Sequence, residues 1–94
     1  MNGLSANPRI VIYTIEPCAP CARAKAFLDA KGFEYEEIPI SPDGDWRGEL
    51  ERHVPGARTF PQVVINGDVV GGYEALRAYH EDGHLVHGSE EFIC

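Results

Sequence analysis

The sequence predicts an α/β domain built on one four-stranded mixed sheet that is flanked by helices. Apolar runs and helix-forming runs alternate along the chain in the order β-α-β-α-β-β-α. The last two strands are separated only by Asn66-Gly67, a strong signal for a two-residue hairpin. The length of 94 residues is that of one small domain. We therefore expect residues 1–94 to form a single domain, and we assign no element to residues 84–94, which have no clear period.

The first half of the chain predicts a strand, a helix and a second strand. "RIVIYTI" (residues 9–15) is rich in β-branched residues with little alternation, as expected of a strand that is covered on both faces. "CARAKAFLDAKG" (residues 21–32) is rich in helix formers, and its last glycine is a natural stop. "FEYEEIPI" (residues 33–40) begins with the alternation of a strand. Because a helix connects the two strands, we expect them to be parallel.

The remaining elements are shorter, and turn residues such as "SPDGD" (residues 41–45) separate them. In the final helix, Leu76 and Tyr79 should face inward, and Gly83 should end the helix. These predicted elements are a helix over residues 45–53, strands over residues 62–65 and 68–71, and a last helix over residues 72–83.

Composition excludes several classes of function. Fifteen acidic residues against eight Lys and Arg give a net charge of −7, which argues against nucleic acid because phosphates would be repelled. No stretch approaches the roughly 20 apolar residues of a membrane span. Residues 1–7 lack the basic start and apolar run of a signal peptide, so we expect a cytoplasmic protein. Three cysteines are too few for a secreted disulfide scaffold, and in a reducing compartment a close pair is catalytic or metal-binding.

The close pair is Cys18 and Cys21, in "EPCAPCARAK" between the first strand and the first helix. A thiolate at a helix N-terminus is stabilised by unpaired backbone N–H groups and by the positive end of the helix dipole. Arg23 and Lys25 follow and add positive charge. Pro20 is tolerated because the first turn needs no N–H from it. A C-x-x-C pair between a strand and a helix is typical of thioredoxin-like redox proteins.

A structural zinc site is the competing interpretation of this pair, with His80 and His84 as two further ligands. However, the stretch of sequence between Cys21 and His80 is far longer than the dozen or so residues that separate the two ligand pairs of a zinc finger. Gly83 should also end the helix before His84. We therefore predict no metal site and expect the histidines near this end to be exposed, namely His80, His84 and His87.

Over residues 9 to about 83 the chain resembles a dithiol glutaredoxin. The motifs that carry the resemblance are "IYT" before the cysteines, the C-x-x-C pair, "GARTFPQVVING" and "VGGYEAL", which occur in the expected order. Glutaredoxins typically have T-V-P where this chain has Thr59-Phe60-Pro61. The resemblance implies a thioredoxin-like fold. "GGYEALRAYH" is similar in particular to phage glutaredoxins, which often serve ribonucleotide reductase.

The resemblance implies a role for each part of the site. Cys18 would attack a disulfide or a glutathione mixed disulfide, and Cys21 would resolve the mixed disulfide formed with a protein. Pro61 would be cis and would expose the backbone of Phe60, which in the family pairs with the cysteinyl part of glutathione. Arg58 matches a position that can reach the glycine carboxylate, and the start of the last helix would bind the γ-glutamyl carboxylate. The implied substrate-binding residues are Arg58, Thr59, Phe60, Pro61, Gly72, Tyr73 and Glu74.

The chain departs from the family pattern at several positions. Many glutaredoxins have Lys where this chain has Ile15, and Asp where it has Ala75. The redox pair is Cys-Ala-Pro-Cys rather than Cys-Pro-Tyr-Cys, and proline in the third place is instead similar to thioredoxin. Cys94 matches no motif of the family, and we interpret it as a surface thiol.

The sequence thus predicts a thiol–disulfide oxidoreductase of cell redox homeostasis, with glutathione as co-substrate and no tightly bound cofactor. Its partners would be glutathione and disulfide-containing proteins, ribonucleotide reductase among them, and the protein would be a monomer. One alternative is a redoxin that takes electrons from thioredoxin reductase. Another is a carrier whose iron–sulfur cluster is held between two protomers by Cys18 thiolates and glutathione.

Overall fold

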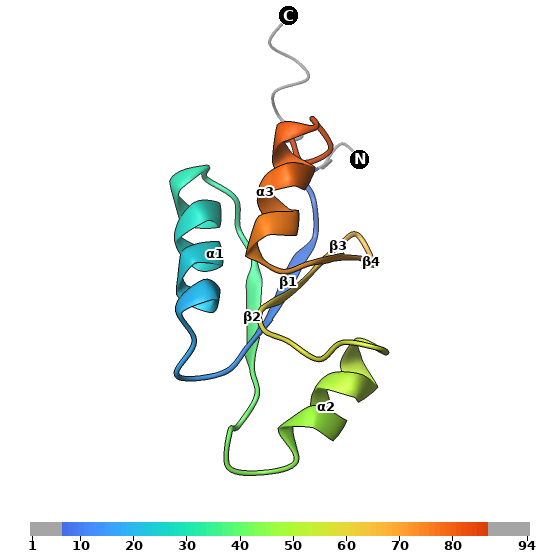
Figure 1. Ribbon diagram of the computed structural model, residues 1–94. Coiled ribbons are helices and arrows are strands. Elements are labelled where there is room, and N and C mark those ends of the chain that lie inside the picture. Colours follow the sequence, from blue (N-terminus) through green and yellow to red (C-terminus); the bar gives the residue numbers. More distant parts are fainter. Residues whose placement is uncertain (1–6, 87–94) are drawn as a thin grey trace, which may run out of the picture.

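The computed structural model describes residues 7–86 of the chain (Figure 1). Strands and helices follow one another in the predicted order β-α-β-α-β-β-α. No helix in this part of the chain is long and apolar enough to cross a membrane. The elements are β1 (Ile10–Thr14), α1 (Ala19–Ala30), β2 (Glu36–Pro39), α2 (Trp46–His53), β3 (Gln62–Ile65), β4 (Asp68–Gly71) and α3 (Tyr73–Glu81).

The four strands form one mixed sheet in the order β2-β1-β3-β4. β1 and β2 are parallel, as the connecting helix predicts, and Ile12 is paired with Glu37. β3 is antiparallel to β1 and to β4. The predicted mixed sheet is therefore confirmed.

Helices lie on both faces of the sheet. α1 and α3 lie next to each other and cover one face, and α2 lies apart from both of them (Figure 1). Tyr13 points away from the α1 face, because its neighbour Ile12 is in the core there, and the ring of His53 from α2 stacks on it at 5.0 Å. The core under α1 and α3 consists of Ile10, Ile12, Ala24, Leu28, Phe33, Val63, Ile65, Leu76 and Leu85.

Glycines at positive φ end the helices and turn the hairpin where the sequence predicts. Gly32 has φ 79° after α1, and the N–H of Phe33 bonds back to the carbonyl of Leu28 at 2.9 Å, which closes a Schellman cap. In the hairpin, Asn66 and Gly67 both have positive φ, at 54° and 87°, as a type I′ turn requires.

Two expectations are corrected. β2 begins at Glu36 rather than at Phe33, because the N–H of Phe33 is used by the cap of α1 and cannot join the sheet. His80 is half-buried rather than exposed, since its ring packs edge-on against Phe27 and Phe33. Leu85, in the segment that the sequence left unassigned, is 2% exposed and belongs to the core. His87 and Cys94 lie outside the described residues.

Candidate active site

The topology brings the predicted site segments to one edge of the sheet. β1 ends beside the start of β3, because Tyr13 is paired with Gln62 in an antiparallel ladder. β4 ends beside the start of β3 for the same reason, with Gly71 paired with Val63. The loop after β1, the loop before β3 and the loop after β4 therefore meet at this edge. These loops carry the cysteine pair, the Arg58–Pro61 segment and the start of α3.

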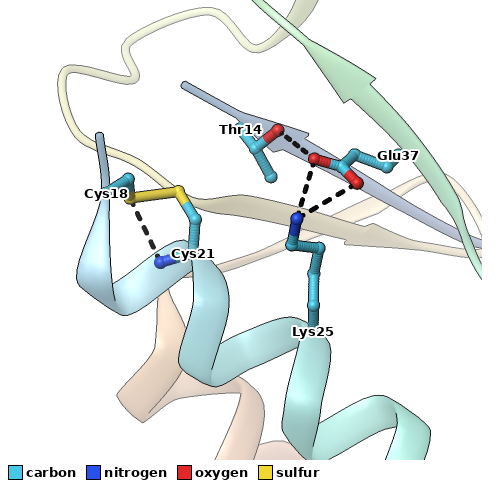
Figure 2. A network of polar contacts seen from close by, with 5 residues as sticks. All are labelled: Thr14, Cys18, Cys21, Lys25 and Glu37. Carbon is cyan, nitrogen blue, oxygen red and sulfur yellow. Dashed lines mark hydrogen bonds and ion pairs between the residues drawn. A yellow bond between two sulfur atoms is a disulfide. The ribbon is translucent and has the colours of Figure 1, made fainter. Parts of the chain in front are cut away.

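Cys18 is the N-cap of α1 and is joined to Cys21 by a disulfide (Figure 2). The two Cα atoms are 5.3 Å apart. The backbone N–H of Cys21 donates to the Sγ of Cys18 over 3.1 Å, so the sulfur takes the position of a capping oxygen. A helix N-terminus favours an anion at this point, and Pro20 in the first turn has no N–H to be satisfied. The predicted placement of the pair is therefore confirmed.

The two sulfurs differ in accessibility. Cys18 is half-buried, whereas Cys21 is 3% exposed and faces the interior of the domain. An external disulfide can reach Cys18, whereas the buried Cys21 is placed to attack only the Sγ of Cys18, once Cys18 is in a mixed disulfide. This geometry agrees with Cys18 as the attacking thiol and Cys21 as the resolving thiol.

The loop before β3 is held in a defined conformation. The Phe60-Pro61 peptide bond is cis, as the resemblance implies, and Pro61 is buried. Gln62, which is 7% exposed, donates its side-chain N–H to the carbonyl of Thr59 over 2.9 Å. Because the paired part of β3 begins at Gln62, the backbone of Phe60 lies outside the sheet. Gln62 is a supporting residue that the sequence analysis missed, although a glutamine at the start of a buried strand signals a need for a partner.

The start of α3 lies against this loop. A Cβ atom on Gly72 would lie 3.7 Å from the carbonyl oxygen of Pro61. Gly72 is the N-cap of α3, and no side chain caps the helix there. The first-turn N–H groups, including those of Tyr73 and Glu74, therefore have no side-chain cap, and such groups bind anions. The side chain of Tyr73 turns toward α1, with its ring 6.5 Å from that of Phe27.

Arg58 lines a surface pocket beside the same loop. The pocket has a volume of 360 Å³ and lies between α2 and the segment before Phe60. The ring of Trp46 lies 5.7 Å from that of Phe60, and the guanidinium of Arg47 lies 5.2 Å from the Trp46 ring. Sequence reasoning named Arg58 and missed Trp46 and Arg47, since no motif marks this helix. The lining residues are Trp46, Arg47, Glu51, Ala57 and Arg58.

Two positions where many glutaredoxins have a charged residue, Lys or Asp, carry the uncharged side chains of Ile15 and Ala75 here. Ile15 is half-buried at the end of β1, and Ala75 borders a groove between β4 and α3. Within residues 7–86, no group of three or more His, Cys, Asp or Glu side chains is placed to hold a metal ion. The zinc arrangement of Cys18 and Cys21 with two histidines is therefore not assembled in this part of the structure.

A polar network that the sequence did not predict lies beside the cysteine pair (Figure 2). The hydroxyl of Thr14, which is 2% exposed, donates to the carboxylate of Glu37 over 2.7 Å. Lys25 from α1 forms an ion pair with the same carboxylate, with Nζ–O distances of 3.1 and 3.2 Å. The Thr14 hydrogen bond and, after it, the Lys25 contact hold the pKa of Glu37 below its usual value. The hydrogen bond to Glu37 raises the pKa of Lys25, so both groups stay charged near neutral pH.

A sheet of this topology with a cystine at the start of its first helix defines a thiol–disulfide oxidoreductase with a thioredoxin-like fold. The family model for glutaredoxin matches residues 10–70. A glutaredoxin from Pseudomonas aeruginosa is 40% identical over 78 residues, which are 83% of this chain and 92% of the relative. Glutaredoxin 3 from Escherichia coli K12 is 38% identical over 76 residues, with 81% and 90% covered. The chain therefore belongs to the glutaredoxin family.

Solved structures agree with this assignment. A buckwheat glutaredoxin–glutathione complex matches with a TM-score of 0.70 at 27% identity, over 94% of this chain and 81% of the other. The expected family and the expected thioredoxin-like fold are thus confirmed.

Proposed function

We propose that this oxidoreductase uses glutathione as its reductant and reduces both protein disulfides and glutathione mixed disulfides. The observation that carries the proposal is the arrangement of cationic and backbone groups around the accessible Cys18. Arg58 lines a pocket next to Phe60, and the uncapped start of α3 lies against Pro61. Glutathione has two carboxylates, one at each end. Arg58 and the start of α3, which would bind them, flank the loop that would hold the central cysteine of glutathione.

The proposed binding mode follows from this arrangement. The glycine carboxylate would meet Arg58, with Arg47 as a second cation on the same pocket. The γ-glutamyl carboxylate would meet the first-turn N–H groups of α3. The backbone of Phe60, outside the sheet, would pair with the cysteinyl part. The buckwheat relative was solved with glutathione, which supports the assignment by analogy.

The proposed chemistry is a pair of thiol–disulfide exchanges. The Cys18 thiolate attacks the substrate disulfide, a mixed disulfide forms, and the first substrate thiol leaves with the electron pair. The Cys21 thiolate then attacks the Sγ of Cys18, the second substrate thiol leaves, and the Cys18–Cys21 disulfide forms. Two glutathione molecules return the pair to the dithiol state and become oxidised glutathione. For a glutathione mixed disulfide, a second glutathione can replace Cys21.

Two further parts of the proposal are the partner and the compartment. We propose ribonucleotide reductase as one protein substrate, supported only by the similarity of "GGYEALRAYH" to phage glutaredoxins. We propose the cytoplasm as the compartment, because its glutathione pool is kept reduced.

Binding of glutathione is tested by changing the charges of the proposed pocket. We expect Arg58→Ala to raise the Michaelis constant for glutathione about tenfold or more, since one charge-assisted hydrogen bond contributes roughly 1.5–3 kcal/mol and each 1.4 kcal/mol is about tenfold. Restoring the family residues as Ile15→Lys together with Ala75→Asp should lower that constant. Arg52→Ala, which removes an exposed arginine from α2 outside the pocket, is the matched control.

Steady-state rates with a glutathione mixed disulfide measure these effects, in assays coupled first to glutathione reductase and then to thioredoxin reductase. If Arg58→Ala changed nothing and only thioredoxin reductase supported turnover, the glutathione proposal would be rejected. The redoxin driven by thioredoxin reductase would then be the better account.

A further inference from the structure

The resolving thiol has an unfavourable environment of its own. Cys21 is 3% exposed, and burial disfavours a charged thiolate. Cys21 is the third residue of α1, and its own backbone N–H donates to the Sγ of Cys18, so this N-terminal hydrogen bond serves Cys18 instead. Nevertheless, Cys21 must lose its proton before it can attack the mixed disulfide on Cys18. A nearby cation would make that step easier.

Lys25 is the cation that the structure places on the same helix face. It lies four residues after Cys21, and side chains at this spacing are neighbours on a helix. Long side chains in a helix point back toward its N-terminus, which directs Lys25 over the turn that carries Cys21. In Figure 2 both side chains point from α1 toward the sheet. Lys25 is also within electrostatic reach of Glu16, in the loop that leads to Cys18, and Glu16 contributes to raising the pKa of Lys25.

Contacts from the sheet fix the position of the ammonium group. Both carboxylate oxygens of Glu37 lie 3.1–3.2 Å from the Nζ of Lys25, and the Thr14 hydroxyl fixes that carboxylate in turn. The Lys25 and Glu37 side chains are 29% and 32% exposed, so water screens the pair only in part. A lysine on a helix surface is otherwise a mobile point charge.

We propose that the anchored ammonium of Lys25 stabilises the thiolate of Cys21 in the resolving step, and that Glu37 and Thr14 are positioning residues that act through Lys25. The inference rests on the proposed role of Cys21 as the resolving thiol. In the assisted step the Cys21 proton passes to solvent and the Cys21 sulfur bonds to the Cys18 sulfur. The bond from Cys18 to the substrate sulfur breaks, and the substrate thiolate leaves with the electron pair.

Several charged or titratable groups face Lys25 or act on it. Glu37 comes from β2, Tyr35 from the segment just before it, and Glu16 from the loop before α1. The anions Glu16 and Glu37 oppose a thiolate by their own charge, so removing Glu37 alone has two opposite effects. A double-mutant cycle between Lys25 and Glu37 separates these effects.

The first experiment measures the pKa of Cys21 when it is the only thiol, in a protein that carries Cys18→Ser and Cys94→Ser. Serine keeps an N-cap oxygen on α1. Thiolate ultraviolet absorbance against pH should show that Lys25→Gln raises the pKa of Cys21 by about 0.5–1. Lys25→Arg keeps the positive charge and should leave the pKa of Cys21 close to that of the parent.

Arg23→Gln is the matched control for Lys25→Gln, since it removes one positive charge from an exposed position of the same helix. We expect it to shift the Cys21 pKa by less than half as much. In a Glu37→Gln background the effect of Lys25→Gln should also fall by half or more. A Lys25→Gln effect equal to that of Arg23→Gln, or unchanged by Glu37→Gln, would overturn the proposal.

The second experiment measures the resolving step directly, in protein that keeps Cys18 and Cys21. A mixed disulfide between Cys18 and thionitrobenzoate releases the coloured thiolate when Cys21 attacks. Near pH 7, Lys25→Gln should slow release about two- to threefold, because the lower thiolate fraction is partly offset by the greater nucleophilicity of a more basic thiol. At a pH where Cys21 is fully ionised in both proteins, Lys25→Gln should instead be about two- to threefold faster, because only the nucleophilicity of its more basic thiolate still differs. A purely structural defect would leave the variant slower at every pH.

This readout contains no glutathione, so it can fail or succeed independently of the proposed reductant. Lys25→Met, which keeps an apolar stem of similar length, serves if Lys25→Gln does not fold. An unchanged release rate and an unchanged pH profile in either variant would refute the role of Lys25.

Discussion

Cys18 and Cys21 belong to one disulfide but occupy different environments. Cys18 caps α1 and accepts a hydrogen bond from a backbone N–H, whereas Cys21 is buried against the sheet. In the dithiol state, the Cys18 thiolate should be the more stable of the two. We expect the pKa of Cys18 to fall within about 3.5–7.5, the range of cysteines activated at helix N-termini.

Substitution of each cysteine separates their roles. Cys18→Ser should abolish reduction of every disulfide substrate, because Cys21, the other cysteine among residues 7–86, is buried. Cys21→Ser should keep measurable activity on glutathione mixed disulfides, which a second glutathione can resolve. Turnover of a glutathionylated peptide and of a protein disulfide measures the two activities. An active Cys18→Ser protein with an inactive Cys21→Ser protein would reverse the roles assigned here.

Glu37 links the site to the stability of the domain. Its pKa is lowered in the folded state, so its contacts stabilise the protein above the ordinary carboxyl pKa of 4.5, and this contribution is lost as the pH falls through the folded pKa. Glu37→Gln should therefore lower the free energy of unfolding by about 1 kcal/mol near pH 7. The difference from the parent should disappear in acid.

Urea unfolding at several pH values measures this difference. Glu36→Gln is the matched control, since Glu36 is exposed and precedes Glu37 on the opposite face of β2. A destabilisation by Glu37→Gln that was the same at acid and neutral pH would contradict the electrostatic explanation.

At the scale of elements, the end of α1 shows how one glycine sets both a helix length and a strand start. Gly32 adopts φ 79°, which lets the N–H of Phe33 reach back to Leu28. The phenyl ring is thereby placed in the core, and the sheet pairing of β2 starts only at Glu36. The alternation at the start of residues 33–40 therefore reports the burial of Phe33 but not sheet pairing, which the sequence analysis expected there.

Replacement of this glycine should destabilise the fold without affecting the chemistry. Gly32→Ala places a Cβ atom in a left-handed conformation, at a cost of about 1–2 kcal/mol. Gly44→Ala is the control, because Gly44 does not have positive φ and a Cβ atom there would meet nothing within 4 Å. Thermal unfolding should show a lower midpoint for Gly32→Ala only. Since Gly32 is at the opposite end of α1 from Cys18, kcat of the folded protein should stay unchanged.

At the scale of the whole molecule, strand order creates the site. β1, β3 and β4 bring three loops to one edge of the sheet, and each loop supplies a different function. These are the sulfur pair, the cis-proline loop with its arginine, and an uncapped helix start. Because the loops are far apart in the sequence, the site depends on the complete sheet.

The redox potential is a property of this assembled site. With Pro20 in the third place of the pair, as in thioredoxin, we predict that the disulfide is favoured more than in a typical glutaredoxin. The potential should lie between the glutaredoxin range of about −200 to −230 mV and the thioredoxin value of about −270 mV. Equilibration in glutathione buffers measures it, and Pro20→Tyr should make it less negative. A parent value more oxidising than about −200 mV would count against the role of Pro20.

The sequence by itself determined the order of elements, the hairpin turn, the helix stops and the cysteine pair. Those features depend on local chemistry: glycine at positive φ, Asn-Gly in a tight turn, and a thiol just before a helix. The motif resemblance added the cis state of Pro61 and the choice of Arg58, because a family pattern carries information that spacing alone does not.

Only the tertiary structure decided which distant side chains meet. Glu37 lies in a strand and Lys25 in a helix, and each is an ordinary charged residue in the sequence; parallel pairing of β1 with β2 and the packing of α1 join them beside Cys21. Trp46 and Arg47 reach the Arg58 pocket in the same way, through the position of α2. Such contacts depend on strand register and helix packing, which are set by the burial of the whole core rather than by any local pattern.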